Sequence, residues 1–207
     1  MAKWRRCPEE RPAQILEAAL DVFARRGFAE ATMDDIAGEA GITKGTIYLY
    51  FEGKRELLLA VVRAQLGRFM ALLPRMHALI TGDIEENARQ LGGDFLGALM
   101  EPEVTKTIQV ILAELQHLPE VKRLYQEEAL PQANVQVAGF LKAHMDVGTF
   151  RQLDPTIATR CLFGMFMIFV LTQEILGASR ITPMSQEAIV DTVTGIFFHG
   201  IMNRGTA

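Results

Sequence analysis

Cysteine and tryptophan are scarce in this chain, which has two cysteines and one tryptophan among 207 residues. Cys7 and Cys161 lie far apart and form no Cys-x-x-Cys pair, so neither a disulfide framework nor a zinc site is indicated. Two reduced thiols are typical of a cytoplasmic protein. We therefore expect a cytoplasmic chain that folds without disulfides, metal ions or cofactors.

Long apolar runs and an excess of positive charge are also missing. The N-terminal Met-Ala-Lys-Trp-Arg-Arg lacks the apolar core of an export signal. The most apolar stretch, residues 161–171, is shorter than the roughly 18 residues that span a bilayer, so we expect no contact with a membrane. With 21 basic and 25 acidic residues the net charge is −4, so any contact with nucleic acid must depend on where the charges lie.

The signatures of an enzyme are absent as well. The four histidines show no H-E-x-x-H spacing, and neither G-x-S-x-G nor a glycine-rich phosphate loop after a strand is present. Gly92-Gly93 lies within a helical pattern and indicates a flexible or closely packed point instead of a nucleotide site. We therefore expect no catalytic site and no enzyme activity.

Helical periodicity, interrupted by proline and glycine, dominates what is present, and no segment alternates with period two as a strand does. Near the N-terminus, Ile15, Ala19 and Phe23 fall on one face of a helix predicted from Pro12 to Arg26, which ends at Gly27. Further helices are expected over residues 83–100, 103–117, 119–146, 154–177 and 185–199. The predicted fold class is all-α.

Two short helices with clear end signals follow the first one. Thr32-Met33-Asp34-Asp35 resembles a capping box and predicts a helix from Met33 to Ala40. Gly41 ends that helix, and Thr43 caps the next one after a turn of about three residues. Two short helices joined by such a turn form a helix-turn-helix.

The second of these helices suits DNA better than a protein core. A recognition helix enters the major groove by its N-terminal end, and a glycine at position 45 lets the backbone approach closely. Hydroxyl and ammonium groups can bind base edges or phosphates, and helix N-termini favour anions. Each residue alone can equally be a cap or a packing residue. The predicted DNA-binding residues are Thr32, Thr43, Lys44, Gly45, Thr46, Tyr48, Tyr50 and Lys54.

The stretch from Ile15 to Val62 closely resembles the DNA-binding domain of the TetR family of bacterial transcriptional regulators. The pattern T-x-x-x-I-A-x-x-A-G-I-x-x-G-T-I-Y-x-Y-F-x-x-K-x-x-L runs from Thr32 to Leu57. The resemblance implies an N-terminal helix-turn-helix DNA-binding domain of about three helices plus a linking helix. With a short basic arm at its start, that domain is expected over residues 1–55. A larger helical domain for ligand binding and dimerisation is expected over residues 56–207.

The last two predicted helices carry a long apolar stripe with small residues. We expect them to form a four-helix interface in a homodimer, as the resemblance implies, although an ordinary core is the alternative. The predicted interface residues are Phe169, Ile189, Val193, Ile196, Phe197 and Ile201.

Methionine and phenylalanine are plentiful between the helix-turn-helix and the C-terminus, and such side chains suit a pocket for variable apolar ligands. An ordinary core explains any single one of them equally well. A drug-like compound and a fatty acyl derivative both fit this composition. The predicted ligand-binding residues are Phe69, Phe95, Met100, Ile111, Phe140, Phe163 and Met167.

Together these features predict a dimeric, sequence-specific DNA-binding regulator. As the resemblance implies, it is expected to be a repressor that a small apolar effector releases from a palindromic operator in double-stranded DNA. An activator, or a repressor that needs no effector, is equally compatible with the sequence. Two alternatives from other classes are a small-molecule sequestering protein with a vestigial DNA-binding domain and an interaction protein that acts through its last helices.

Overall fold

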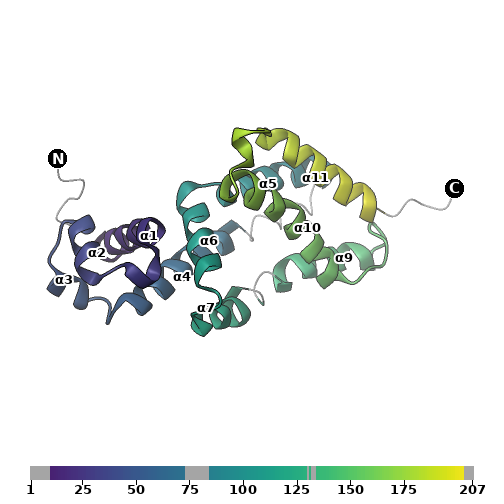
Figure 1. Ribbon diagram of the computed structural model, residues 1–207. Helices are drawn as coiled ribbons and strands as arrows, with labels where there is room; N and C mark the ends of the chain where they lie inside the picture. Colours follow the sequence, from purple (N-terminus) through teal and green to yellow (C-terminus); the bar gives the residue numbers. More distant parts are fainter. Residues whose placement is uncertain (1–9, 73–83, 130, 132–133, 203–207) are drawn as a thin grey trace. The chain divides into compact units, whose positions relative to one another are not determined.

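The computed structural model describes residues 10–72, 84–129, 131 and 134–202. Within these residues all regular secondary structure is helical, and the only β contact is an isolated bridge between Phe150 and Met202. The order of the helices along the chain is shown in Figure 1. The predicted all-α class is confirmed.

The chain divides into two compact units. Unit 1 comprises residues 1–67 and 102–126, and unit 2 comprises residues 68–101 and 127–207. This grouping differs from the predicted boundary near residue 55, because two helices from the middle of the sequence join the N-terminal unit. Unit 1 holds α1 (Arg11–Glu30), α2 (Met33–Ala40), α3 (Lys44–Tyr48), most of α4 (Lys54–Leu72), α6 (Pro102–Glu114) and α7 (Pro119–Leu124).

The ends of the first helices follow the predicted signals. Thr32 and Asp35 form the capping box at the start of α2, with the Thr32 hydroxyl accepting from the Asp35 amide at 3.1 Å. Gly41 ends α2 with φ +65°, a left-handed conformation that glycine adopts without strain. Gly27 also has a positive φ, of +77°, and interrupts α1 where the helix was predicted to end, but helical structure resumes as far as Glu30.

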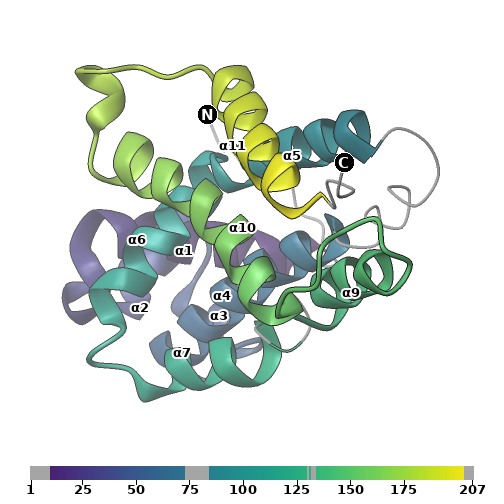
Figure 2. The ribbon, with the colours of Figure 1, turned by 90° about the vertical axis from the view of Figure 1, so that its right-hand side faces the viewer.

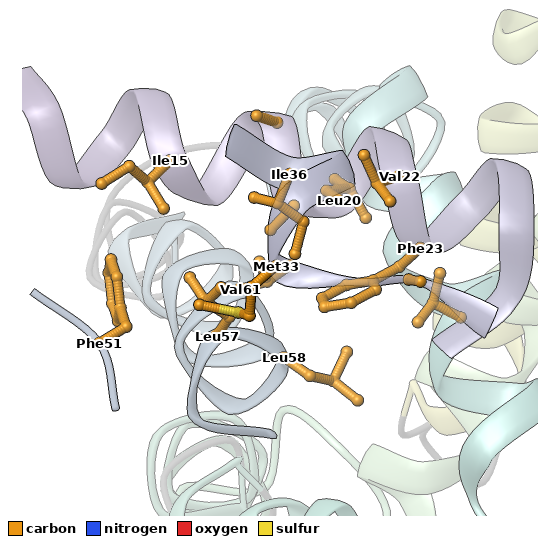
Figure 3. Packing of buried hydrophobic residues seen from close by; sticks show 14 of the residues in the cluster. Ile15, Leu20, Val22, Phe23, Met33, Ile36, Phe51, Leu57, Leu58 and Val61 are labelled. Atoms are coloured by element: carbon orange, nitrogen blue, oxygen red, sulfur yellow. The ribbon is translucent and has the colours of Figure 1, made fainter. Parts of the chain in front are cut away.

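The core of unit 1 lies between α1, α2 and α4. Figure 3 shows Ile15 and Phe23 of α1, Ile36 of α2 and Leu57 of α4 pointing toward one another, and each is at most 1% exposed. Val110 of α6 belongs to the same cluster, and the α6 and α7 side chains therefore extend this core.

An ion pair and shared packing hold α6 against α1. Lys106 Nζ lies 2.7 Å from Asp21 Oδ1, and the hydrogen bond from this ammonium to Asp21 raises the pKa of Lys106. A second pair joins Arg55 at the start of α4 to Glu120 of α7 at 3.0 Å. These contacts explain why the two helices group with the N-terminal unit.

Unit 2 is also helical, and several of its segments are π-helical or 3₁₀. The pair α5 and α11 lies side by side in both views of the ribbon (Figures 1 and 2), and the two helices pack against each other. The helical segments of unit 2 are α5 (Ile84–Leu99), the π-helical η4 (Asn134–Ala138), α9 (Gly139–Asp146), α10 (Pro155–Phe169), the π-helical η5 (Val170–Ile175), the 3₁₀ helix η6 (Ala178–Arg180) and α11 (Gln186–Ile201). A further π-helical turn, η3 (Tyr125–Ala129), leads from α7 into this unit.

The helix made of α10 and η5 is the most apolar element of the described chain. It runs over Pro155–Ile175, which by length and composition alone is enough to cross a membrane, and 22% of its most apolar window is buried. A helix was expected over residues 154–177, but the prediction of no membrane contact compared only the apolar run at residues 161–171 with the length of a membrane span. Much of this helix therefore presents apolar side chains that its own unit does not cover.

Gly92 marks the closest approach between helices of unit 2. A Cβ atom at this position would lie 3.1 Å from both Phe166 Cζ of α10 and Thr194 Cγ2 of α11, and 3.3 Å from Val190 Cγ1. These distances are shorter than ordinary van der Waals contact. At the neighbouring Gly93, a Cβ would meet nothing within 4 Å.

We predict that Gly92→Val destabilises the protein and that Gly93→Val does so much less. Both changes place the same β-branched residue in α5, so the difference between them isolates the crowding against α10 and α11. The expected difference in the free energy of unfolding is about 1–3 kcal/mol, typical of overpacking. Urea denaturation measures it, and equal losses for the two variants would contradict the close approach.

Candidate functional site

The five-residue helix α3 is held in place by one buried side chain. Ile47 is fully buried in the cluster of unit 1, whereas Tyr48 is 49% exposed and Leu49 is 80% exposed. The Ile42 amide donates to the Ala37 carbonyl at 3.0 Å, which fixes the turn between α2 and α3. The outer face of α3 is therefore presented to solvent on a rigid support.

Gly45 lies on this exposed face, and packing within the chain does not require a glycine there. The nearest atom to a Cβ at position 45 would be the Thr43 hydroxyl oxygen, 3.9 Å away, which is ordinary contact. Its backbone conformation is not left-handed either. The missing side chain thus leaves room for a molecule outside the protein to approach the backbone of α3.

Several predicted DNA-binding hydroxyls already have partners inside the protein. The Thr32 hydroxyl accepts from the Asp35 amide and donates to Asp35 Oδ2 at 2.7 Å, and the bond donated to the carboxylate lowers the pKa of Asp35. The Thr43 and Thr46 hydroxyls lie 2.9 Å apart. Thr32 and Thr43 therefore act as the helix caps that the sequence also allowed, and one of the Thr43 and Thr46 hydroxyls keeps its proton for a further acceptor.

Lys44 is paired with an acidic residue that the sequence analysis did not consider. Its ammonium nitrogen lies 2.8 Å from Asp34 Oδ2 at the start of α2, and this hydrogen bond raises the pKa of Lys44. Both side chains are exposed. The two positions are ten residues apart, so no local pattern in the sequence reports the pair.

Lys54 makes contacts inside the protein, and its predicted phosphate contact stays a prediction. Its ammonium donates to the carbonyl oxygens of Phe28 and Ala29 near the end of α1, and it lies 4.6 Å from the centre of the Phe28 ring. Carbonyl groups at a helix C-terminus attract cations. Lys54 therefore ties the start of α4 to the end of α1.

A cavity of about 70 Å³ lies in unit 2 between α5, η4, α9, α10 and α11. Three of the predicted ligand-binding residues line it, namely Phe95, Phe140 and Phe163. Phe166 and Phe198 add two more aromatic rings that the prediction did not include. The described residues that line the cavity include one acid, Asp94, and no basic residue.

The other predicted ligand residues lie elsewhere. Ile111 packs against the core of unit 1, Met100 follows the end of α5 without lining the cavity, and Met167 is 38% exposed on α10. The side chain of Phe69 lies outside the described residues. Apolar residue type alone did not separate a pocket from a core.

The predicted dimer residues divide between two faces. Ile189, Val193, Phe197 and Ile201 are each at most 6% exposed, because unit 2 itself covers them. Only Ile196, at 62% exposure, stands fully on the outer face, and Phe169 is half-buried. The stripe on α11 was identified correctly as apolar, but most of it faces its own chain.

A capped helix-turn-helix joined to a helical unit with an apolar cavity defines the class of ligand-binding transcriptional regulators. Comparison with known proteins agrees with this class. Residues 15–61 match the bacterial regulatory proteins of the tetR family, and residues 86–200 match the C-terminal domain of AefR-like transcriptional repressors. The chain belongs to the TetR family of transcriptional regulators and has a DNA-binding helix-turn-helix and a ligand-binding C-terminal domain.

One curated relative is similar over most of the chain, and others are similar over shorter stretches. An uncharacterized HTH-type transcriptional regulator of Bacillus subtilis (strain 168), YezE, is 27% identical over 150 residues, which are 70% of this chain and 76% of that protein. Five other curated regulators match over 57 to 88 residues, only 27–42% of their length.

Solved structures share the fold. A TetR-family regulator from Mesorhizobium loti has a TM-score of 0.78 and 23% identity, and the match covers 94% of this chain and 98% of that one. The regulator FadR from Bacillus subtilis, solved in complex with stearoyl-CoA, has a TM-score of 0.72 and 22% identity, with 91% and 98% covered.

The contacts of Lys54 generate a prediction about stability. Lys54→Met removes a charged donor from two carbonyl oxygens at the end of α1 and should lower the free energy of unfolding by about 1–2 kcal/mol. Lys44→Met is the matched control, since its exposed ion pair contributes little to stability. Chemical denaturation compares the two. Equal stability of both variants would argue against the structural role of Lys54.

Proposed function

We propose that this regulator binds a palindromic operator as a homodimer and acts as a repressor that a small apolar effector releases from DNA. The observation that carries the proposal is the exposed face of α3, where Gly45 leaves the backbone open between Lys44 and Tyr48. In this proposal the protein works in the cytoplasm, where its DNA is, and no catalysis is involved.

In the proposed complex the N-terminal end of α3 enters the major groove. Thr43, Lys44 and Thr46 reach base edges or phosphates, and Gly45 allows close approach. The hydroxyl groups of Tyr48 and Tyr50, which are 49% and 39% exposed, bind phosphate oxygens. The free backbone amides at the start of α2, which Thr32 caps, can bind a further phosphate. Lys54 holds the start of α4 against the end of α1.

The effector site is the cavity of unit 2. A typical ligand pocket measures roughly 300–1,000 Å³, whereas this cavity measures about 70 Å³. An effector larger than a few carbon atoms therefore binds only if helices or phenylalanine rings around the cavity move. Such a ligand binds the moved state better than the resting one, which is the condition for shifting a protein between two states.

The lining favours an apolar group inside the cavity. Five phenylalanines line it, and the Thr194 hydroxyl already donates to the Val190 carbonyl at 2.7 Å. Burying a charged carboxylate among the described lining residues would be costly, because none of them is basic. The acyl chain of a fatty acyl compound, as in the FadR complex, and an apolar drug-like molecule both meet this condition.

The chain offers a route from the cavity to the DNA-binding helices. Phe95 of α5 lines the cavity, and α6 begins at Pro102 after only Met100 and Glu101. The ion pair of Lys106 with Asp21 then ties α6 to α1. In this proposal a movement of α5 is passed to unit 1 through α6, and the connection at residues 101–102 is one of three covalent connections between the units.

The dimer surface in this proposal is the outer face of α10, η5 and α11, and it is covered by a second copy of the chain. Ile157, Ile168 and Ile196 are 49–62% exposed there. Gly164 and Gly195 on the same helices allow close approach, since a Cβ at either would meet nothing within 4 Å. Burial by a partner also accounts for an apolar helix of membrane-spanning length in a DNA-binding regulator.

Selection of binding sites from random duplex DNA tests the proposed function. We expect a palindrome that binds about 10³-fold or more tightly than a scrambled duplex in anisotropy titrations at two salt concentrations. We also expect saturating 1-decanol, used as an apolar probe, to weaken operator binding, and saturating operator to weaken 1-decanol binding by the same factor. Decanol binding that is independent of DNA would contradict the effector mechanism.

A protein without a preference for any palindrome would belong to one of the other two classes. Equal, salt-sensitive affinity for both duplexes, together with tight binding of apolar ligands, would favour the small-molecule sequestering protein instead. A stable complex with a different protein through α10 and α11 would favour the interaction protein. The DNA and ligand arms therefore separate the regulator from the sequestering protein, and detection of a complex with a different protein identifies the third class.

The dimer surface yields a separate prediction. Ile196→Glu should convert the dimer to a monomer, because it places a charge at the centre of an apolar interface. Val147→Glu is the matched control, since Val147 is 77% exposed just after α9 and lies off this face. Analytical ultracentrifugation measures both masses. A dimer that survives Ile196→Glu would place the interface elsewhere.

A further inference from the structure

We propose that Asp34 is a specificity-determining residue, which holds Lys44 at the start of α3 and weakens binding to DNA other than the operator. This inference rests on the proposed function, namely that α3 enters the major groove. It adds a residue that neither the sequence pattern nor the family resemblance assigns to DNA recognition.

The geometry places the Asp34 carboxylate directly beside the recognition helix. Asp34 is the second residue of α2 and Lys44 is the first residue of α3, so the ion pair joins the N-terminal ends of the two helices. The distance between Lys44 Nζ and Asp34 Oδ2 is 2.8 Å, and the side chains are 45% and 70% exposed. Both groups therefore lie at the surface that DNA would approach.

The ion pair of Asp34 contributes little to the fold. Its neighbour Asp35 completes the capping box with Thr32 and pairs with Arg26 at 2.9 Å. The contact described for the Asp34 carboxylate is with Lys44, and exposed ion pairs of this kind contribute little to stability. A role in positioning Lys44 explains the pair better than a role in folding does.

The ion pair of Asp34 and Lys44 discriminates between DNA sequences because Lys44 finds a suitable acceptor only on some bases. An ammonium group has three donors, so Lys44 can keep Asp34 as a partner while it donates to a guanine O6 or N7 in the groove. On DNA without a guanine at that place, Lys44 stays with Asp34 and makes no contact with the DNA, because turning to a phosphate would leave Asp34 unpaired close to the negative backbone. The penalty falls on the wrong sequences, which is how unpaired charges give specificity.

Nearby cations do not relieve this penalty, because they are engaged elsewhere. Arg25 pairs with Glu39 at 2.7 Å, Arg26 pairs with Asp35, and Lys54 binds the end of α1. Lys44 is thus the cation closest to Asp34 at the start of α3 among the residues that the structure describes. Asp34 therefore controls how far the Lys44 ammonium is available to bind DNA.

Asp34→Asn tests the proposal, since it removes the charge and keeps the shape. We expect its affinity for a scrambled duplex to rise about fivefold or more, while its affinity for the selected operator changes less than twofold. Lys44 released from Asp34 gains a phosphate contact, so the slope of log K against log salt on the scrambled duplex should steepen by about 0.9. Thermal unfolding of the variant should match that of the wild type.

Glu39→Gln is the matched control, because it removes one carboxylate from an ion pair at the other end of α2. It should change the affinities for both duplexes by the same factor. In Lys44→Met, the additional change Asp34→Asn should no longer alter the ratio of the two affinities, since the released cation is gone.

The proposal is overturned if Asp34→Asn folds normally and leaves the ratio of the two affinities unchanged. This includes the case in which both affinities rise by the same factor, as expected from net charge alone, and the case in which neither changes. Failure of the proposed function is a distinct result, because the wild type itself would then show no preference for any operator.

Discussion

Burial of Ile47 is the contact on which the presentation of the recognition helix depends. The helix α3 has five residues, and isolated helices shorter than roughly 12–15 residues are marginal in water. Its conformation therefore comes from the fully buried Ile47, from the Thr43 cap and from the turn at Gly41. Because these contacts use the inner face of the helix, Lys44, Gly45 and Tyr48 remain outside.

The charges around this helix follow from the same arrangement. A chain with net charge −4 gains little from bulk attraction to DNA. In unit 1 the arginines and lysines near α2 and α3 are paired with carboxylates or carbonyl groups, as Arg25, Lys44 and Lys54 illustrate. DNA must therefore share these cations with their partners or take them over, which depends on the sequence of the DNA more than attraction by free charges does.

Local signals in the sequence predicted the helix-turn-helix well, and longer-range contacts could not be predicted. The capping box at Thr32 and the left-handed turn at Gly41 depend on residues within three positions of each other, so their spacing is sufficient evidence. The acceptors of Lys54 lie 25 and 26 residues away in sequence, and no local pattern reports them. For the same reason Asp34 was not linked to Lys44.

Amphipathic patterns had a similar limit in unit 2. The stripe through Ile189 and Phe197 shows that one face of α11 is buried, but the pattern does not say whether a second chain or α5 covers it. The pocket is another case, because Phe95 lines the cavity while Ile111, equally apolar, packs in the core of unit 1. Residue type determines that a side chain is buried, and only the three-dimensional packing determines where.

The helix α10 connects the proposed effector site with the proposed dimer surface. Phe163 and Phe166 line the cavity, whereas Ile168 is 49% exposed. Two residues further along an α-helix turn the side chain by about 200°, so Phe166 and Ile168 point in nearly opposite directions. In the proposed mechanism, a ligand that displaces Phe166 by moving or rotating the backbone of α10, and not by turning the ring alone, also moves Ile168. That movement changes the surface offered to the second copy, and the same helix can thus link effector binding to the separation of two recognition helices.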